Sequence, residues 1–174
     1  MKLNLQSSDF ELFGVPEQFH LSGVDLDKRW KELQREVHPD KFAARGPSAQ
    51  RIAMQWSVRV NEAYNRLRDP LQRAAYLCER RGAPINAEIN TAMPADFLAE
   101  QMTWREALDD AHSDQAVDQL AAKLARVRSE ILEQIGGLLD TADDAPAAAR
   151  QVRALMFIER FARDIEARFE QLGQ

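Results

Sequence analysis

The sequence predicts an all-α protein, with an N-terminal helical hairpin followed by a C-terminal antiparallel three-helix bundle. Strong helix formers such as Ala, Leu, Glu, Arg and Gln are plentiful, whereas the 174 residues include only seven Gly and seven Pro. The chain lacks the alternating Val, Ile and Thr runs that would indicate strands. Hydrophobic residues make up 45% of the sequence, which is enough for a globular protein of one domain or two small ones.

The first helices are predicted from their start and stop signals. A short helix is expected over residues 9–13, with a stop at Gly14. Ser22 is a suitable N-cap for the next helix, which should run to Val37. Pro39 ends that helix, because its ring disfavours helical geometry at the preceding residue and it has no N–H to donate.

Two long apolar stripes predict a hairpin. A longer helix should open at Pro47 and Ser48. The stripe of the first helix contains Leu26, Trp30, Leu33 and Val37. The second helix carries Ile52, Trp56, Val60, Ala63, Tyr64 and Leu67, of which Trp56, Val60, Tyr64 and Leu67 form the matching stripe. Two antiparallel helices would bury the stripes together and leave the connection, residues 38–46, as an exposed tip.

The rest of the chain divides at Pro and Gly signals. Asp69-Pro70 is typical of an N-cap followed by a first-turn proline, so a helix is expected over Leu71–Arg81 before Gly82. Residues 83–93, APINAEINTAM, break the periodicity and should form a linker. Three helices should follow at roughly Pro94–Ala111, Asp114–Leu139 and Ala145–Leu172, with Gly136-Gly137 fraying or bending the end of the second. The predicted domains are therefore 1–82 and 94–174.

Composition excludes several classes of function. Residues 1–82 hold 14 Lys and Arg against 11 Asp and Glu (net +3), and residues 83–174 hold 9 against 17 (net −8). Neither half is basic enough for a nucleic-acid binder, and the opposite biases favour two protein-binding surfaces. Cys78 is the only cysteine, so we expect no disulfide, no Cys-based metal cluster and no cofactor. Without a signal peptide, a membrane-length apolar run or a long coiled-coil seam, a cytoplasmic monomer is expected.

The hairpin tip carries the sequence His38-Pro39-Asp40-Lys41, which allows three interpretations. It is a simple turn, a catalytic His/Asp pair, or a rigid docking tip. Catalysis has little support, because neither of the other histidines is at ligand spacing and no nucleophile motif or phosphate loop occurs. The docking interpretation accounts for all of these features, since Pro39 stiffens the tip and Asp40 offers a carboxylate to a partner arginine. A basic stripe on the preceding helix, containing Lys28, Lys31 and Arg35, could steer an acidic partner.

Helical periodicity predicts a second surface on the 94–111 helix. Phe97, Trp104, Leu108 and Ala111 share the core sector with Gln101. Leu98 and Met102 lie about 100–140° from Phe97 at 100° per residue, beside acidic residues such as Glu106. On the last helix, Phe157 lies about 100° outside the core stripe by the same geometry, so it is a candidate anchor. The alternative is a wide core that takes in all three apolar side chains.

Several segments together resemble a known family. HPDKF between two such helices, followed by VNEAYNRLRDP, resembles a J-domain, the module that activates heat-shock ATPase chaperones. DFELFGVP, LQREVHPDKF, DPLQRAAYL, FLAEQMTWREAL and RALMFIERF, in that order, are similar to the HscB co-chaperones of iron–sulfur cluster assembly. Some eukaryotic relatives carry a zinc module of CxxC pairs, which a single cysteine cannot supply, so the resemblance is to the bacterial form.

The resemblance implies a partner for each surface. The J-domain would contact an HscA- or DnaK-type chaperone and stimulate its ATPase through His38, Pro39, Asp40 and Lys41, assisted by Lys28, Lys31 and Arg35. The bundle would bind the scaffold protein IscU through Leu98, Ala99, Met102, Thr103, Glu106, Asp110 and Phe157. Leu98, Glu106 and Phe157 keep the family's residue types, whereas Ala99 and Thr103 are smaller or less charged. One chain holding both partners would deliver the client to the chaperone.

Two other functions stay open at this point. A general J-domain co-chaperone would share the HPDK tip but recruit another folded client, and failure to bind IscU would identify it. A structural helical adaptor would use the tip only as a turn, so that Asp40→Asn would change no ATPase stimulation. An enzyme is a third alternative, in which removal of His38 would lower a measurable turnover.

Overall fold

The computed structural model describes residues 2–174 and confirms the all-α class. Within that range the chain forms α-helices and one 3₁₀ helix, without a β-strand. No helix of the described chain combines the length and hydropathy needed to cross a bilayer. The chain divides into two compact units, one extending to Tyr76 and the other covering Leu77–Gln174.

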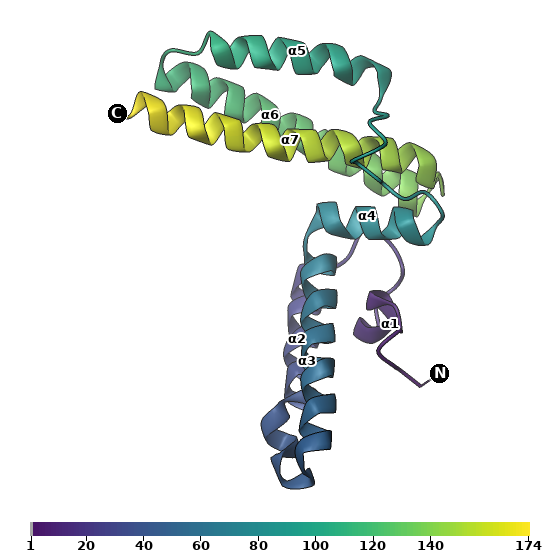
Figure 1. The fold of residues 1–174 in the computed structure, drawn as a ribbon. Helices are drawn as coiled ribbons and strands as arrows, with labels where there is room; N and C mark the ends of the chain where they lie inside the picture. The colour runs from purple at the N-terminus through teal and green to yellow at the C-terminus, as the bar shows by residue number, and fades with distance from the viewer. Residues whose placement is uncertain (1) are drawn as a thin grey trace. The chain divides into compact units, whose positions relative to one another are not determined.

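The first unit contains the predicted hairpin. Its elements are α1 (Asp9–Phe13), α2 (Gly23–Val37), the 3₁₀ helix η1 (Pro39–Arg45) and α3 (Pro47–Arg68). Figure 1 shows α2 and α3 side by side with η1 in their connection. The Ser22 hydroxyl accepts the N–H of Asp25 at 3.2 Å, which confirms the predicted N-cap. The connection predicted only as an exposed tip is thus largely helical, with seven residues in η1.

The two apolar stripes form the core of the hairpin along most of its length. Leu26, Val60 and Leu67 are fully buried, and Trp30 stacks on Tyr64 with ring centroids 4.9 Å apart. Near the start of α3, η1 packs against the helix and Ala53 is buried, whereas Ile52 stays 56% exposed.

A buried ion pair fixes α1 against α3. The Asp9 carboxylate is fully buried, with Oδ1 2.8 Å from Arg59 Nη2 and Oδ2 2.6 Å from Arg66 Nε. Arg59 also donates to the carbonyls of Leu5 and Ser7, which holds the preceding segment on the same helix. The large apolar residues of α1 are buried: Phe10, Leu12 and Phe13.

The helix α4 (Pro70–Arg80) begins and ends at the signals that predict it. Asp69 Oδ1 accepts the N–H of Leu71 at 3.0 Å, as an N-cap before a first-turn proline should. Gly82 follows the helix with φ of +79°, a conformation that disfavours other residues. The division between the two units falls within α4, at Tyr76 and Leu77.

The second unit is the predicted three-helix bundle. Its helices are α5 (Ala95–Asp109), α6 (Asp114–Asp140) and α7 (Ala145–Leu172). In Figure 1, α6 and α7 run together over their length and α5 lies along them. The α6 helix ends at Asp140, one residue from its predicted end, but it continues through Gly136-Gly137 without the fraying expected there. Packing explains the difference, because Ile135, Gly136 and Leu139 are all buried.

The core of the bundle is aromatic under α5 and aliphatic elsewhere. Phe97 and Trp104 of α5 are buried with rings 5.4 Å apart, and Ile158, Phe161 and Ile165 of α7 are buried too. Residues 83–93 form no helix and lie inside the second unit. They contain a turn at Asn86, whose φ is +45°.

Candidate functional site

The His38–Lys41 corner is an ordered, exposed turn. His38 takes an extended conformation (φ −60°, ψ 127°) between α2 and η1, as expected before a proline. Its Nδ1 accepts the N–H of Asp40 at 3.3 Å, and its carbonyl accepts the N–H of Lys41 at 3.0 Å. These bonds fix the backbone of the corner while the Asp40 side chain stays 91% exposed. The carboxylate is therefore displayed to solvent from a rigid turn.

The basic stripe lies on the exposed side of α2. Lys28, Lys31 and Arg35 are exposed, and none has an acidic side chain within ion-pair distance in residues 2–174. Arg29, by contrast, lies 3.6 Å from Glu32 of the same helix. Arg35 is in the last turn of α2, where the helix dipole favours a cation. The three cations are thus exposed on the helix that leads to the corner.

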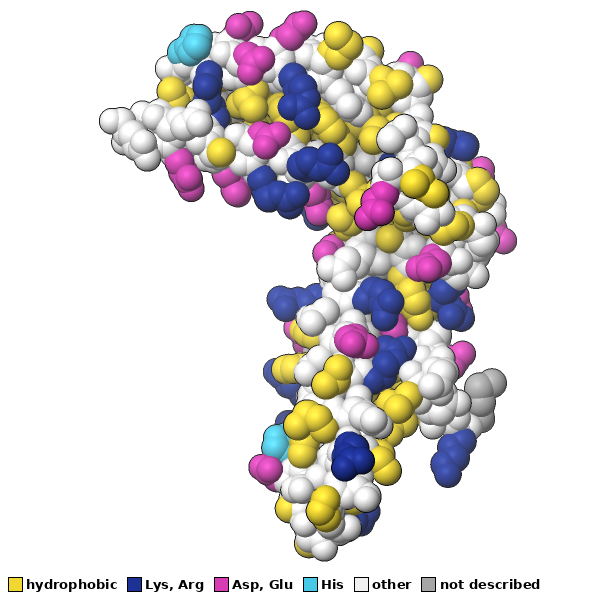
Figure 2. Space-filling model, in the orientation of Figure 1, with side chains coloured by type: hydrophobic (Ala, Val, Ile, Leu, Met, Phe, Trp, Pro, Cys, Tyr) yellow, Lys and Arg dark blue, Asp and Glu magenta, His cyan; other side chains and the backbone are white. Residues whose placement is uncertain are grey.

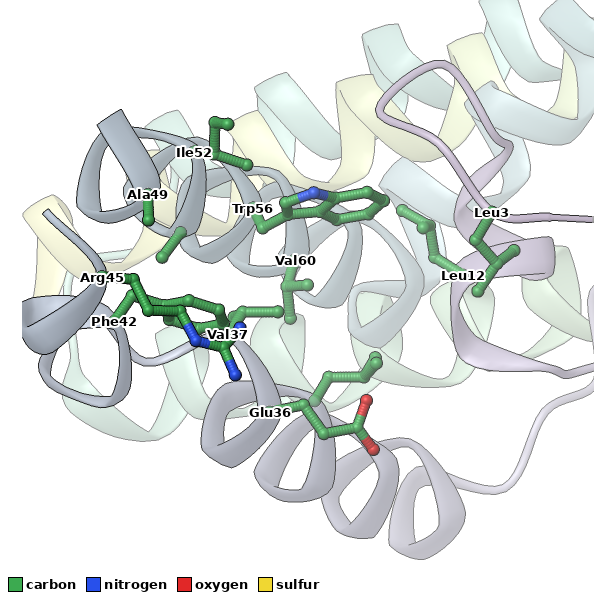
Figure 3. A pocket seen from close by; sticks show the side chains of 12 residues that line it. Leu3, Leu12, Glu36, Val37, Phe42, Arg45, Ala49, Ile52, Trp56 and Val60 are labelled. Atoms are coloured by element: carbon green, nitrogen blue, oxygen red, sulfur yellow. The ribbon is translucent and has the colours of Figure 1, made fainter. Parts of the chain in front are cut away.

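An apolar groove of about 470 Å³ opens beside the corner. In Figure 3, Phe42 and Arg45 of η1 lie at one end and Leu3 and Leu12 at the other. Residues from α2 and α3 form its walls: Leu33, Glu36, Val37, Ala49, Ile52, Ala53, Trp56 and Val60. Periodicity did not predict this groove, because it depends on where η1 and the N-terminal segment leave α3 uncovered.

The surface predicted on α5 is exposed. Leu98 and Met102 have exposed fractions of 58% and 67%, which are high for large apolar side chains. The four polar or small residues predicted with them are exposed too: Ala99, Thr103, Glu106 and Asp110. We call these six residues the α5 face. Figure 2 shows hydrophobic side chains over the N-terminal part of α5 and acidic ones over its C-terminal part.

Phe157 requires a correction, because the structure places it in the core rather than on the surface. Its side chain is only 7% exposed. It stacks on Phe161 at 5.8 Å and meets Phe97 edge-on at 5.7 Å. The alternative of a wide core therefore holds for Phe157 but not for Leu98 or Met102. An angle of 100° on one helix does not expose a side chain when a second helix covers that side.

Arg105 lies between the core and the α5 face, and the sequence reasoning missed it. Its guanidinium carbon is 5.5 Å from the centroid of the Phe157 ring and 5.8 Å from that of Phe161. A cation over an aromatic ring is favourable, so Arg105 covers what would otherwise be the exposed edge of the aromatic cluster. No signal in the sequence indicated this contact, because the two rings belong to another helix.

Neither a cluster of candidate metal ligands nor a cysteine with a lowered pKa occurs among residues 2–174. Among residues 2–174, no three His, Cys, Asp or Glu side chains gather at positions that could hold a metal ion. Cys78 is buried, and that burial raises the pKa of its thiol to about 11 despite the nearby Arg81 and Arg153. A thiol with so high a pKa is a poor nucleophile at neutral pH.

Comparisons with known proteins agree with the resemblance over almost the whole chain. The family model described as "HSCB C-terminal oligomerisation domain" matches residues 93–166. The co-chaperone protein HscB homolog of Burkholderia vietnamiensis is 51% identical over 173 residues, which cover 98% of each chain. That of Burkholderia cenocepacia is 50% identical over the same lengths.

Solved structures share the fold. Chaperone HscB from Vibrio cholerae is 34% identical with a TM-score of 0.82, and the match covers 95% of this chain and 99% of that one. Human co-chaperone protein HscB is 24% identical with a TM-score of 0.88, over 100% of this chain and 87% of that one, and supports the fold alone. With half of its residues identical to those of full-length relatives, the chain belongs to the HscB family of co-chaperones.

Proposed function

We propose that this protein binds an IscU-type scaffold, delivers it to an HscA- or DnaK-type chaperone in the cytoplasm, and stimulates that chaperone's ATPase. The observation that carries the proposal is the presence of two exposed surfaces in two separate compact units. The His38–Lys41 corner and basic stripe lie in the first unit, and the α5 face lies in the second.

The corner is suited to an ATPase domain. An exposed carboxylate on a rigid turn can pair with an arginine with little loss of loop entropy, and the basic stripe can steer an acidic partner surface towards it. The chemistry of ATP hydrolysis belongs to the partner, so this chain acts as a regulator.

The α5 face is suited to a folded client. Two large exposed apolar side chains beside an acidic edge favour a partner with an apolar patch and nearby basic residues. Stimulated hydrolysis would then trap the client on the chaperone and promote transfer of its iron–sulfur cluster.

Calorimetric titration with IscU tests the client. We expect binding that weakens at least tenfold in Leu98→Ala/Met102→Ala, because two central apolar contacts are lost. Ile89→Ala is the matched control, since Ile89 is 86% exposed but lies outside the α5 face, and it should bind like the unmodified protein. If the double substitution leaves binding unchanged, the client-binding site lies elsewhere on the protein. No binding by the unmodified protein would favour a general co-chaperone with another client.

A single-turnover ATPase assay with the partner chaperone tests the corner. Asp40→Asn should abolish stimulation, because the carboxylate that pairs with the partner arginine is lost. Asp25→Asn on the same unit is the control, as it changes the net charge equally outside the corner. Full stimulation by Asp40→Asn would support the structural adaptor instead.

A further inference from the structure

The helix that carries the α5 face has few buried side chains of its own. Only Phe97 and Trp104 of α5 are buried, whereas α6 and α7 each bury many more residues. Phe97 lies in the first turn of α5 and Trp104 in the third, so no buried side chain of α5 holds its last turn. Contacts from α7 hold both the segment that leads into α5 and the end of the helix.

Arg153 of α7 holds the segment that enters α5. Its side chain is only 6% exposed and donates to three backbone carbonyls. Nε donates to Ile85 at 3.0 Å, Nη1 to Ala92 at 3.1 Å and Nη2 to Pro84 at 3.4 Å. Because Ala92 lies two residues before Pro94, the N-cap of α5, these bonds fix where the helix begins.

Arg168 of α7 holds the other end. Its Nε donates to the carbonyl of Ala111 at 3.2 Å, and its Nη2 donates to that of Asp109 at 3.1 Å. Asp109 is the last residue of α5, where carbonyls have no intrahelical partner and the helix dipole is negative. The guanidinium therefore caps the helix and ties it to α7 at once.

The two ends carry different parts of the α5 face. Leu98 lies in the first turn, near the Arg153 contacts, and Asp110 lies beside the Arg168 contacts. The same order is visible in Figure 2, with hydrophobic side chains towards the start of α5 and acidic ones towards its end.

We propose that Arg153 and Arg168 are positioning residues for client binding: Arg153 sets the apolar part of the α5 face, and Arg168 sets its acidic part. The proposal rests on the proposed function. Neither arginine is part of the α5 face, and each acts by fixing the backbone that displays it. Loss of one clamp should therefore affect only the contacts at its own end.

Double-mutant cycles measured by titration with IscU test this division. Arg168→Gln should weaken binding about three- to tenfold, the amount expected for a lost helix cap. Its effect should be non-additive with Asp110→Ala and additive with Leu98→Ala. For Arg153 we choose the conservative change Arg153→Lys, because a larger change at a buried site could prevent folding. Its effect should be non-additive with Leu98→Ala and additive with Asp110→Ala. Arg163→Gln is the control, because Arg163 is exposed on α7 in a groove lined by α6 and α7.

A merely structural role would give another result. A substitution that only destabilised the whole protein would lower the midpoint of urea unfolding. Its effect on binding would then couple equally to Leu98→Ala and to Asp110→Ala. Equal coupling, or additivity in both cycles, overturns the proposal. Arg168→Lys keeps the positive charge but lacks the planar guanidinium that reaches two carbonyls. It should therefore recover only part of the affinity that Arg168→Gln loses.

Hydrogen exchange on the free protein tests the clamp without a client. Arg168→Gln should raise exchange of the amides in the last turn of α5, while those of α6 and α7 keep their rates. Unchanged exchange in α5 contradicts the clamp. If the unmodified protein fails to bind IscU, the proposed function fails, and the exchange result still decides whether α7 fixes the ends of α5.

Discussion

Asp9 and Asp40 are carboxylates of the same unit, yet their surroundings give them opposite roles. Asp9 is fully buried between two arginines and ties α1 to α3. Asp40 extends into solvent from the corner, where its Oδ2 lies 3.6 Å from Nδ1 of the neighbouring His38. A buried charge must be paired to be tolerated, whereas an exposed one is free to pair with another protein.

Asp9→Asn should therefore lower the free energy of unfolding by about 3 kcal/mol, because it leaves two guanidinium groups without their buried partner. Urea unfolding followed by circular dichroism measures the change. Asp40→Asn is the matched control, and its unfolding midpoint should stay unchanged. A midpoint for Asp9→Asn equal to that of the control would show that the pair contributes nothing to stability.

Cys78 provides a chemical test of burial, since it is the only cysteine of the chain. Its pKa is raised to about 11 by burial, so very little thiolate exists at pH 8. We expect alkylation by iodoacetamide to be on the order of a hundredfold slower in the folded protein than in urea, where an ordinary thiol pKa applies. The folded rate should rise with pH towards 11. Mass spectrometry measures both rates, and equal rates would mean that the thiol is accessible.

At the scale of elements, polar contacts across the hairpin set how α2 meets α3. Asn61 Oδ1 accepts from Trp30 Nε1 at 2.9 Å and from Gln34 Nε2 at 2.6 Å. One turn along, the Tyr64 hydroxyl donates to the Asp27 carboxylate, which raises the pKa of Tyr64. The segment NEAY therefore orients the helix that carries the basic stripe.

Asn61→Ala should cost about 1 kcal/mol of unfolding free energy, because two donors lose an acceptor near solvent. Tryptophan fluorescence during urea unfolding reports the change, since Trp30 is one of those donors. Asn65→Ala, an exposed change on the same helix, should have little effect. Equal losses of unfolding free energy in the two variants would show that the Asn61 hydrogen bonds to Trp30 and Gln34 add no stability.

The α5 face and the aromatic cluster behind it should respond differently to truncation. Phe157→Ala removes a buried ring and should cost about 3–5 kcal/mol of stability. Leu98→Ala and Met102→Ala remove exposed side chains and should leave the unfolding midpoint almost unchanged. Any loss of client binding in Phe157→Ala then arises through a displaced α5. A fully stable Phe157→Ala protein would contradict this packing.

At the scale of the whole molecule, the proposed function requires both surfaces in one chain. The corner and the α5 face belong to different compact units, so variants of one should leave the other intact. Covalent connection keeps a bound client at high local concentration near the chaperone.

A mixture of two variants tests this requirement. Asp40→Asn keeps the α5 face, and Leu98→Ala/Met102→Ala keeps the corner, but no single chain in the mixture has both. We expect the mixture to lack the extra ATPase stimulation that IscU gives with the unmodified protein. Restored stimulation would show that the two activities need no connection.

Helix positions and the two exposed surfaces were predictable because they depend on local rules. Ser22, Asp69 and Gly82 act within a few residues of the helices that they begin or end. The HPDK corner is exposed because proline ends α2 at the tip of a hairpin. The exposure of Leu98 and Met102 was predicted from their angular positions on a single helix.

Only the tertiary structure decided what depends on a second element. Phe157 is buried because α5 covers it, and Ile52 is exposed on a groove beside the corner that η1 helps to line. Arg153 and Arg168 contact backbone carbonyls about 60 to 70 residues earlier in the chain. Periodicity gives the direction of a side chain on its own helix. It does not say which neighbour lies in that direction, because packing between distant segments determines it.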